Sequence, residues 1–570
     1  MFSVVNLKDK LVSLRTFLFS SKFWLPGLFL VLIFCYAYRP LAESDSFYHL
    51  KVGELIWQTG EMPHSDVFSY TASGSFWVPH EWLAELIFYG VWSVSGFWGL
   101  IGFCSLLASI AFFLIYRMML ERGVNHYLGS LLLFALGYFA LELWVPRPQT
   151  FAYLSFVFLI YCLERYRAKR ELKYLCLVVG TIWFWANTNA SFILGIVVLG
   201  WYFISSFVSR RYSLEDNLGS TPRSRNIFLA LVASVALSLL NPSGYHIWLY
   251  SWYIAPTVKA LDVFEWRPIW RYFYEFETKV FLVELAVSAV LLLWYMGWRR
   301  GSRDWTLLGL VFGISILPFL SIRHVGFWPL AAILPLSISI SGLLSGIMES
   351  ANQKKIVLVV GIVGLAMLAG RILAWPKLYF DPNYVPSFAA DFIEQNNVKG
   401  PFFNLYNEGG YLIWRFWPKE KVFIDGRSEV YTLPVLEELS AIYHSKPGSE
   451  KLIDEKYKIN YFILSYRGAS ERVVGLVRTL INRNWPMVYW DDAVLVFIRP
   501  SEENMPVINK YAIRHLNPFR MPGDIPQEES KEAALEANLL LERIPHSRVI
   551  EAYIWELLGS RKPQEVKPGQ

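Results

Sequence analysis

The chain has 570 residues, of which 54% are hydrophobic and only 18% charged, with 24 Trp, 32 Tyr and 41 Phe. This balance excludes a disordered chain, collagen, a coiled coil and a cytosolic enzyme, and it is typical of a polytopic membrane protein with aromatic belts. The formal net charge of +6 comes from Lys and Arg in short loops between apolar runs. It therefore reflects orientation in a membrane, and no nucleic-acid partner is expected.

The four cysteines lie in apolar stretches, so neither a disulfide framework nor a thiolate metal site is indicated. They are Cys35, Cys104, Cys162 and Cys176.

Apolar runs near the length needed to cross a bilayer, about 20 residues, recur along the first two thirds of the chain. The first, 24–38, follows a basic segment and no small-residue cleavage site comes after it, which predicts a retained helix. The others are 97–116, 126–143, 150–164, 174–190, 191–208, 227–240, 280–297, 305–320, 325–347 and 356–374. We therefore predict an α-helical polytopic membrane protein with about 11 transmembrane helices, and an interfacial helix at 82–94.

Lys and Arg gather in alternate loops, beginning with the N-terminal segment. The positive-inside rule places those loops in the cytoplasm. With an odd number of spans, everything after residue 375 then lies on the other side. We expect a protein of the bacterial inner membrane with a cytoplasmic N-terminus and a periplasmic or extracellular C-terminal domain.

The C-terminal third changes character after the last span. Short apolar strands alternate with helix-like segments over 376–500, which predicts an extracytoplasmic α/β domain with Asp491 and Asp492 at the turn of its last hairpin. A linker and a helical tail occupy 501–570, with helices at 528–543 and 549–558. Residues 1–375 form the transmembrane domain in this interpretation. The expected strands are 402–405, 422–424, 461–464, 488–490 and 494–498, and the expected helices are 411–416, 434–444 and 471–481.

The first outer loop, 39–82, is rich in residues that can carry chemistry. If a helix begins near Asp45, His49 lies one turn further on the same face. A carboxylate held there can act as a general base or as a ligand of a divalent cation such as Mg²⁺ or Mn²⁺. The loop also holds Asp66, His80 and Glu81. The alternative is an ordinary solvated loop with a capped helix start.

Other outer turns carry polar residues beside the membrane face, where polar groups usually line a cavity or a contact. They include Glu142 with Arg147, Asn241, Glu265 with Arg267, and Arg323. Each has a structural alternative, such as a helix end, a snorkelling side chain or a local ion pair. Together they predict one outward-facing cavity, in which guanidinium groups hold the oxygens of a phosphate.

In the C-terminal domain, Asp425 and Arg427 follow a predicted strand, which is a usual place for binding residues in an α/β domain. The alternative is a structural ion pair. Gly409 and Gly410 open a helix that could hold an anion, or they form a tight turn.

The segment SDSFYHLKVGELIWQTGEMPHSDVFSYT after the first helix, followed by WVPHEWLAE, resembles the large multispanning glycosyltransferases of the GT-C class. These enzymes use polyprenyl-phosphate-linked or diphosphate-linked sugars. The odd span count and the outer domain resemble the oligosaccharyltransferase catalytic subunit. NEGGYLIWRFWPKEKVFIDGR is loosely similar to its WWDYG segment, but it keeps only the acidic-Gly-Tyr part and lacks both tryptophans.

The resemblance implies roles for several of these residues. Asp45 matches the catalytic Asp of the first outer loop, as base for the acceptor or as metal ligand. Glu142 matches the second acid of the class, with Asp66 as its rival, and Arg323 matches the late cation that engages the lipid phosphate. His49 joins the catalytic set as an orienting residue. The implied substrate-binding residues are Arg147, Arg323, His80, Glu81, Asn241, Asp425 and Arg427.

The expected function is transfer of a sugar, with inversion, from a polyprenyl-phosphate or diphosphate carrier to an envelope glycan, lipid or protein. The partners are then the lipid-linked donor, the acceptor and membrane lipids. The alternatives are a non-catalytic membrane scaffold of a glycosylation assembly, a transporter, and a polysaccharide polymerase or ligase that would rely on outer-loop arginines and histidine.

Overall fold

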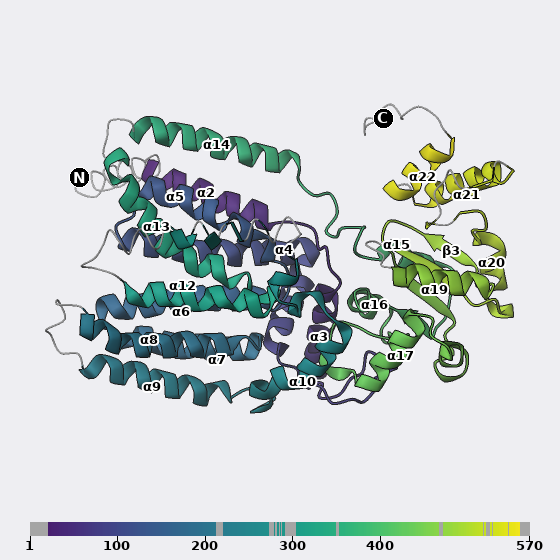
Figure 1. Cartoon of the computed structure of the whole chain (residues 1–570), viewed down its shortest axis with the longest axis horizontal. Coiled ribbons are helices and arrows are strands. Elements are labelled where there is room, and N and C mark those ends of the chain that lie inside the picture. Colours follow the sequence, from purple (N-terminus) through teal and green to yellow (C-terminus); the bar gives the residue numbers. More distant parts are fainter. Residues whose placement is uncertain are drawn as a thin grey trace, which may run out of the picture.

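The computed structural model places a body of long helices beside a smaller part built around a four-stranded sheet (Figure 1). The structure describes residues 21–212, 221–272, scattered positions between 279 and 290, 304–348, 353–466, 471–516, 518–519, 525–526, 528–544 and 547–558.

The helices of the body run side by side, and each predicted span that the structure describes coincides with one of them. The predicted span 280–297 falls mostly outside the described residues. The helices are α2 (Ser21–Ala37), α4 (Trp82–Glu121), α5 (His126–Gly137) with the 3-10 turn η1 (Tyr138–Leu143), α6 (Gln149–Lys169), α7 (Leu172–Thr188), α8 (Phe192–Tyr212), α9 (Thr221–Ser238), α12 (Trp305–Leu320), α13 (Phe327–Met348) and α14 (Gln353–Leu373).

The interfacial helix expected at 82–94 and the span at 97–116 are the two halves of α4. They join at Gly96, whose backbone is not helical (φ 65°, ψ −167°). A positive φ is strained for residues with a side chain, so Gly allows the chain to turn here without ending either half. The break in the helix therefore lies in the gap that the sequence interpretation left between the two segments.

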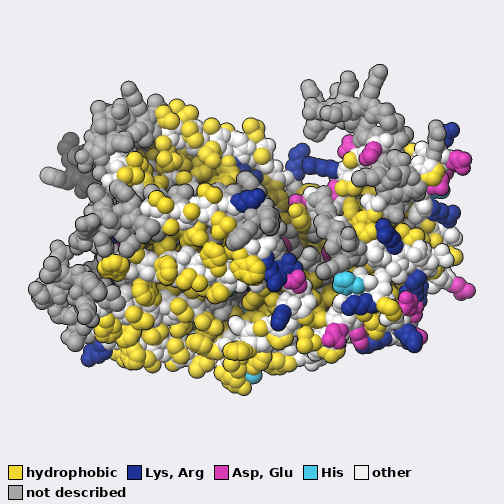
Figure 2. Space-filling model, viewed as in Figure 1, with side chains coloured by type: hydrophobic (Ala, Val, Ile, Leu, Met, Phe, Trp, Pro, Cys, Tyr) yellow, Lys and Arg dark blue, Asp and Glu magenta, His cyan; other side chains and the backbone are white. Residues whose placement is uncertain are grey.

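The surface of the helical body is strongly apolar. Figure 2 shows hydrophobic side chains covering it, whereas charged side chains gather on the part that contains the sheet. Large apolar residues such as Phe312, Leu240 and Val197 are more than half exposed. Among the described residues, Trp82–Glu121 and Phe327–Leu344 are long and apolar enough to cross a membrane, and several other apolar helices are shorter. Eleven spans therefore remain a prediction.

The part that contains the sheet, called the α/β part below, extends over 387–498. Its strand order is β1-β2-β4-β3, with β1 parallel to β2 and the other pairs antiparallel. The elements are α15 (Ser387–Gln395), β1 (Phe402–Asn404), α16 (Gly409–Phe416), α17 (Leu433–Tyr443), β2 (Tyr461–Ser465), α19 (Glu471–Asn482), β3 (Met487–Trp490) and β4 (Val494–Ile498).

One predicted strand is wrong. Residues 422–424 form no strand, because Val422 makes only an isolated bridge with Ser69 of the 39–82 loop. Phe423 and Ile424 are nevertheless fully buried. Their apolar run therefore reflects burial between the α/β part and the 39–82 loop rather than membership in the sheet.

The tail packs against the last hairpin of the sheet. Asp491 accepts hydrogen bonds from the backbone N–H groups of Ala493 and Val494, both at 2.8 Å, which forms the predicted turn. Asp492 accepts from the Ser547 hydroxyl at 2.8 Å and thereby holds the start of α22. The described residues of the tail contain the short 3-10 turn η7 (Glu502–Asn504), the helix α20 (Met505–Tyr511), which the sequence interpretation missed, and the two predicted helices α21 (Ser530–Arg543) and α22 (Arg548–Leu558).

The 39–82 loop belongs to the core of the α/β part. It contains α3 (Asp45–Thr59) and three fully or almost fully buried aromatic residues, Phe47, Phe68 and Trp77, in one apolar cluster with Phe423. At Gly53, a side chain would collide with the Glu85 carbonyl oxygen, 2.1 Å from the position of a Cβ. Gly53 therefore allows α3 to lie directly against α4. This packing connects the helical body to the α/β part through α3.

Candidate active site

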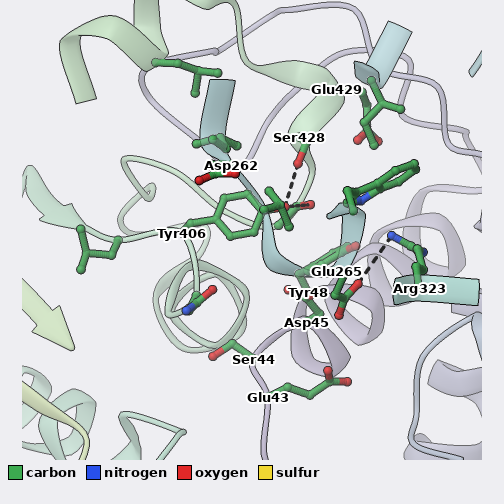
Figure 3. Close-up of a pocket in the computed structure, with 18 of the residues that line it drawn as sticks. Glu43, Ser44, Asp45, Tyr48, Asp262, Glu265, Arg323, Tyr406, Ser428 and Glu429 are labelled. Atoms are coloured by element: carbon green, nitrogen blue, oxygen red, sulfur yellow. Dashed lines mark hydrogen bonds and ion pairs between the residues drawn. The ribbon is translucent and has the colours of Figure 1, made fainter. Parts of the chain in front are cut away.

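A cavity of about 820 Å³ opens where α3, the outer turns of the helical body and the α/β part meet. Figure 3 shows acidic residues and Arg323 pointing into it from these different segments. Six of the sequence-predicted site residues line this cavity: Asp45, His49, His80, Glu81, Arg147 and Arg323. The predicted joint cavity thus exists, and it collects residues that are far apart in sequence.

Asp45 is the first residue of α3, as predicted, and two glycines of the α/β part fix its surroundings. A Cβ on Gly410 would lie 2.4 Å from the Ser44 carbonyl oxygen. A Cβ on Gly426 would lie 2.5 Å from Oδ1 of Asp45. Both positions therefore require glycine for this close approach.

Arg147 is the centre of an ion cluster. Its Nε lies 2.9 Å from Oε2 of Glu43, and its Nη1 lies 2.6 Å from Oε1 of Glu265. Its Nη2 donates to Oδ2 of Asp45. One guanidinium thus joins the segment before α3, the turn before α6 and the 3-10 turn η2 (Phe264–Trp266).

Arg323 lies on the neighbouring wall, on the 3-10 turn η4 (Ile322–His324). Its Nη1 is 3.8 Å from Oε2 of Glu265, and its guanidinium stands 5.2 Å from the Trp266 ring centre. With its amide turned to present oxygen, Gln149 accepts from Nε and Nη2 of Arg323 at 2.9 and 2.6 Å. The guanidinium of Arg323 is therefore held at the cavity wall by Glu265, Trp266 and Gln149.

The carboxyl groups around Arg147 differ in acidity. Burial raises the pKa of Glu43 to about 7, with Arg147 acting against this shift and Asp45 and Glu265 adding to it. Burial also raises the pKa of Asp45, again against the effect of Arg147. Arg147 lowers the pKa of Glu265 to about 2. Glu265 is thus the carboxyl group of the cluster that stays ionised at neutral pH. Asp45 and Glu43 instead have a raised proton affinity, which a general base needs.

A second group of titratable residues lies deeper. Nδ1 of His49 is 2.9 Å from Oε1 of Glu85 and 3.9 Å from Oε2 of Glu81. Burial lowers the pKa of His49 to about 3, although Glu81 acts in the opposite direction. His49 is therefore neutral at physiological pH. Its neutral ring can orient groups near Asp45 through one hydrogen bond, but it cannot supply positive charge.

His80 and Glu81 form an ion pair beside it, with Nε2 of His80 3.6 Å from Oε1 of Glu81. Burial raises the pKa of Glu81, but His80 outweighs this and brings it to about 2. Burial would lower the pKa of His80, and Glu81 raises it above the ordinary value. Asn189 also donates to Glu81 at 2.8 Å. Oε1 of Glu81 is therefore engaged by two neighbours, whereas Oε2 is approached only by His49, at 3.9 Å.

The predicted metal ligand Asp45 does not fit a divalent cation in this arrangement, because its Oδ2 already accepts from Arg147. A different set of described residues could hold a metal ion: His49, Glu81 and Glu85 each offer a ligand atom, and these atoms lie within 4.8 Å of one another. Oε2 of Glu85 is buried without a hydrogen-bond partner. A neutral imidazole and two carboxylates are ordinary ligands of transition metals.

Five predicted site residues are not among those that line the cavity. Asp66, Asp425 and Arg427 form a buried network, in which Nη2 of Arg427 lies 2.7 Å from an oxygen of each acid. Asn241 donates to the Ala186 carbonyl oxygen at 2.9 Å and caps the turn before α10 (His246–Leu261). Glu142 is part of η1, and its side chain lies outside what the structure describes. Asp425 and Arg427 are thus paired with each other, and their binding to substrate stays a prediction.

The sequence interpretation missed one wall of the cavity. Glu429 accepts from Nε1 of Trp77 at 3.1 Å and from the Tyr250 hydroxyl at 3.4 Å. Tyr250 belongs to α10, and its ring centre lies 3.8 Å from that of His80. Tyr406 donates to the Gly426 carbonyl oxygen at 2.9 Å. In the sequence, Glu429 is marked only by its position two residues after Arg427, which was itself a predicted site residue.

Comparisons with known proteins support the fold. No protein-family model matches the chain, and no curated protein sequence matches it. Solved structures of the oligosaccharyltransferase AglB from Archaeoglobus fulgidus are similar. One, in complex with an inhibitory peptide and a dolichol-phosphate, has a TM-score of 0.53 and 10% identity. Another, tethered with an acceptor peptide containing the NVT sequon, has a TM-score of 0.51 and 11% identity.

Both matches cover 84% of this chain and 74% of the other. At this identity the likeness concerns the fold. It confirms, at the level of the fold, the distant resemblance to the oligosaccharyltransferase catalytic subunit that the span count and the outer domain suggested.

Proposed function

We propose that this protein transfers a sugar from a polyprenyl-phosphate or diphosphate carrier to an acceptor in the envelope. The observation that carries the proposal is that Asp45, Arg147 and Arg323 line one cavity beside the apolar helical body. A carboxyl group with a raised pKa and two guanidinium groups are the elements that a glycosyl transfer from a lipid phosphate requires.

In the proposed reaction, Asp45 takes a proton from the acceptor nucleophile. The nucleophile forms a bond to the anomeric carbon, and the bond from that carbon to the phosphate oxygen breaks with its electron pair. The leaving phosphate gains negative charge, which Arg323 stabilises through bidentate hydrogen bonds. A single displacement of this kind inverts the anomeric configuration.

The geometry also supports a place for each substrate. The helical body offers an exposed apolar surface to a polyprenyl chain, and Arg323 lies where this body meets the cavity. Another part of the cavity lining comes from α17, with Leu436 and Leu439. We assign that part of the lining to the acceptor, which is an envelope glycan, a lipid or a protein. The related archaeal enzyme was solved with an acceptor peptide, which favours a protein among the three.

The membrane orientation predicted from loop charge completes the proposal. The N-terminus lies in the cytoplasm of a bacterial cell, and the α/β part lies on the outer face of the inner membrane. A divalent cation such as Mn²⁺ would be held by His49, Glu81 and Glu85, whose ligand atoms lie within 4.8 Å of one another.

The first test is Asp45→Asn in protein purified in lipid nanodiscs. We expect the release of polyprenyl phosphate from a panel of polyprenyl-phosphate sugars, with membrane extract as acceptor, to fall at least about 10²-fold. Thermal unfolding should stay as in the wild type. Glu61→Gln, an exposed carboxylate of the same loop, is the matched control and should keep full activity.

Retained transfer by Asp45→Asn would contradict the assignment of the base. If the wild type binds polyprenyl phosphate but releases none from any sugar donor, the non-catalytic scaffold becomes the better interpretation.

A further inference from the structure

Three carboxylates from separate segments share one guanidinium at the cavity wall. Each nitrogen of Arg147 serves a different acid: Nε faces Glu43, Nη1 faces Glu265, and Nη2 faces Asp45. The guanidinium therefore stands at the point on which the three acids converge.

Convergent carboxylates are the usual ligand set of a hard divalent cation, which takes oxygen ligands at roughly 2.0–2.6 Å. Here the space between the acids is filled by a planar, permanently charged group whose donors point outward in fixed directions. A metal ion could bind to these acids only after Arg147 had left. Binding would then also require the burial of a guanidinium without its partners, which is costly.

We propose that Arg147 is a built-in cation that takes the place of a divalent metal at Asp45. This inference deepens the proposed function and rests on it for its catalytic consequence. Arg147 holds Asp45 in position as a positioning residue, and Arg323 remains the guanidinium that faces the lipid phosphate. Transfer then needs no divalent cation bound by Asp45.

The experiment measures Mn²⁺ binding to the full chain in nanodiscs by electron paramagnetic resonance, so it needs no substrate. Arg147→Ala opens the site between the three acids, and we expect it to bind about one more Mn²⁺ per chain than the wild type. Arg147→Ala with Asp45→Asn should lose that additional ion. Arg147→Lys keeps a cation at the site and should gain none.

Subtraction of the wild-type signal removes any ion held by the separate set of His49, Glu81 and Glu85. The additional Mn²⁺ should also raise the thermal unfolding temperature of Arg147→Ala, and it should leave that of the double variant unchanged. No gain of Mn²⁺ by a folded Arg147→Ala would overturn the proposal.

Asp45→Asn in the otherwise wild-type chain gives a second test that does not depend on the folding of Arg147→Ala. Its Mn²⁺ binding should equal that of the wild type. A loss would show that Asp45 ligates a metal in the native protein and would overturn the proposal. Because binding is measured without turnover, a wrong assignment of the transferase reaction would leave these results unchanged.

Discussion

Nη2 of Arg427 lies 2.7 Å from Oδ1 of Asp66, so one guanidinium fastens the 39–82 loop to the α/β part. The same nitrogen lies 2.7 Å from Oδ2 of Asp425, and the side chains in both pairs are at most 1% exposed. The guanidinium also stands 4.9 Å from the ring centre of Phe68 and 4.8 Å from that of Trp77. This cluster supports the cavity from outside it.

Arg427→Met should therefore act on stability. Two buried carboxylates would lose their cation, and we expect a loss of about 3–5 kcal/mol in the free energy of unfolding. Denaturant or thermal unfolding in nanodiscs measures it. Arg415→Met is the matched control, because Arg415 pairs with Asp391 and Glu394, which are 45% exposed, and such pairs contribute about 1 kcal/mol or less.

The other possible outcome is that Arg427→Met unfolds like the wild type but fails to bind or turn over the donor. That result would support the substrate-binding role that the sequence suggested for Arg427.

Gly426 gives a test of the geometry around Asp45 that leaves every charged group in place. A Cβ at this position would lie 2.5 Å from Oδ1 and 3.1 Å from Cγ of Asp45, so Gly426→Ala must displace that carboxylate. Displacement of a reacting group by about 1 Å can cost up to about 10²-fold in rate. We expect transfer to fall by about that factor, with a small change in thermal unfolding.

Gly475→Ala on α19 is the control, since nothing lies within 4 Å of a Cβ there. It should keep its activity and gain up to about 1 kcal/mol in stability, as Ala does over Gly in a helix. Full activity of Gly426→Ala would mean that the position of Asp45 is not critical for transfer.

Periodicity and length were sufficient to predict the helices of the body, because a long apolar run has few alternatives to a helix. They failed where tertiary contacts decide the structure. Residues 422–424 resemble a strand, but the 39–82 loop covers them and Val422 pairs only with Ser69. Helix α10 was missed because Pro256 and Lys259 interrupt its apolar pattern.

The candidate site was predictable to the extent that its residues share a membrane-facing location. Asp45, Arg147 and Arg323 were expected in one cavity and lie in one. The sequence could not reveal that Arg147 would face three acids, since that depends on how α3 docks on α4 and on the α/β part. Nor could it separate Asp66, which is buried with Arg427, from the acids of the cavity.

Glu408 offers a prediction on pH dependence. It precedes α16, is buried, and its Oε2 has no hydrogen-bond partner. Burial raises the pKa of this carboxyl group from 4.5 to about 7, so the folded state binds its proton more tightly than the unfolded state does. The free energy of unfolding should therefore decrease as the pH rises from about 4.5 to about 7.

Glu408→Gln removes the ionisation and keeps the size of the side chain. At pH 8 we expect the variant to be more stable than the wild type by roughly 1–3 kcal/mol, because each pKa unit corresponds to about 1.4 kcal/mol. Below about pH 4.5 both states of the wild type hold the proton, and the advantage should disappear. Thermal unfolding between pH 4 and pH 9 measures the difference.

Glu437→Gln on the exposed side of α17 is the matched control, and its difference from the wild type should not vary with pH. Equal destabilisation by Glu408→Gln at every pH would contradict the prediction. It would mean that Glu408 contributes a needed acceptor at the start of α16, for which a neutral amide is no substitute.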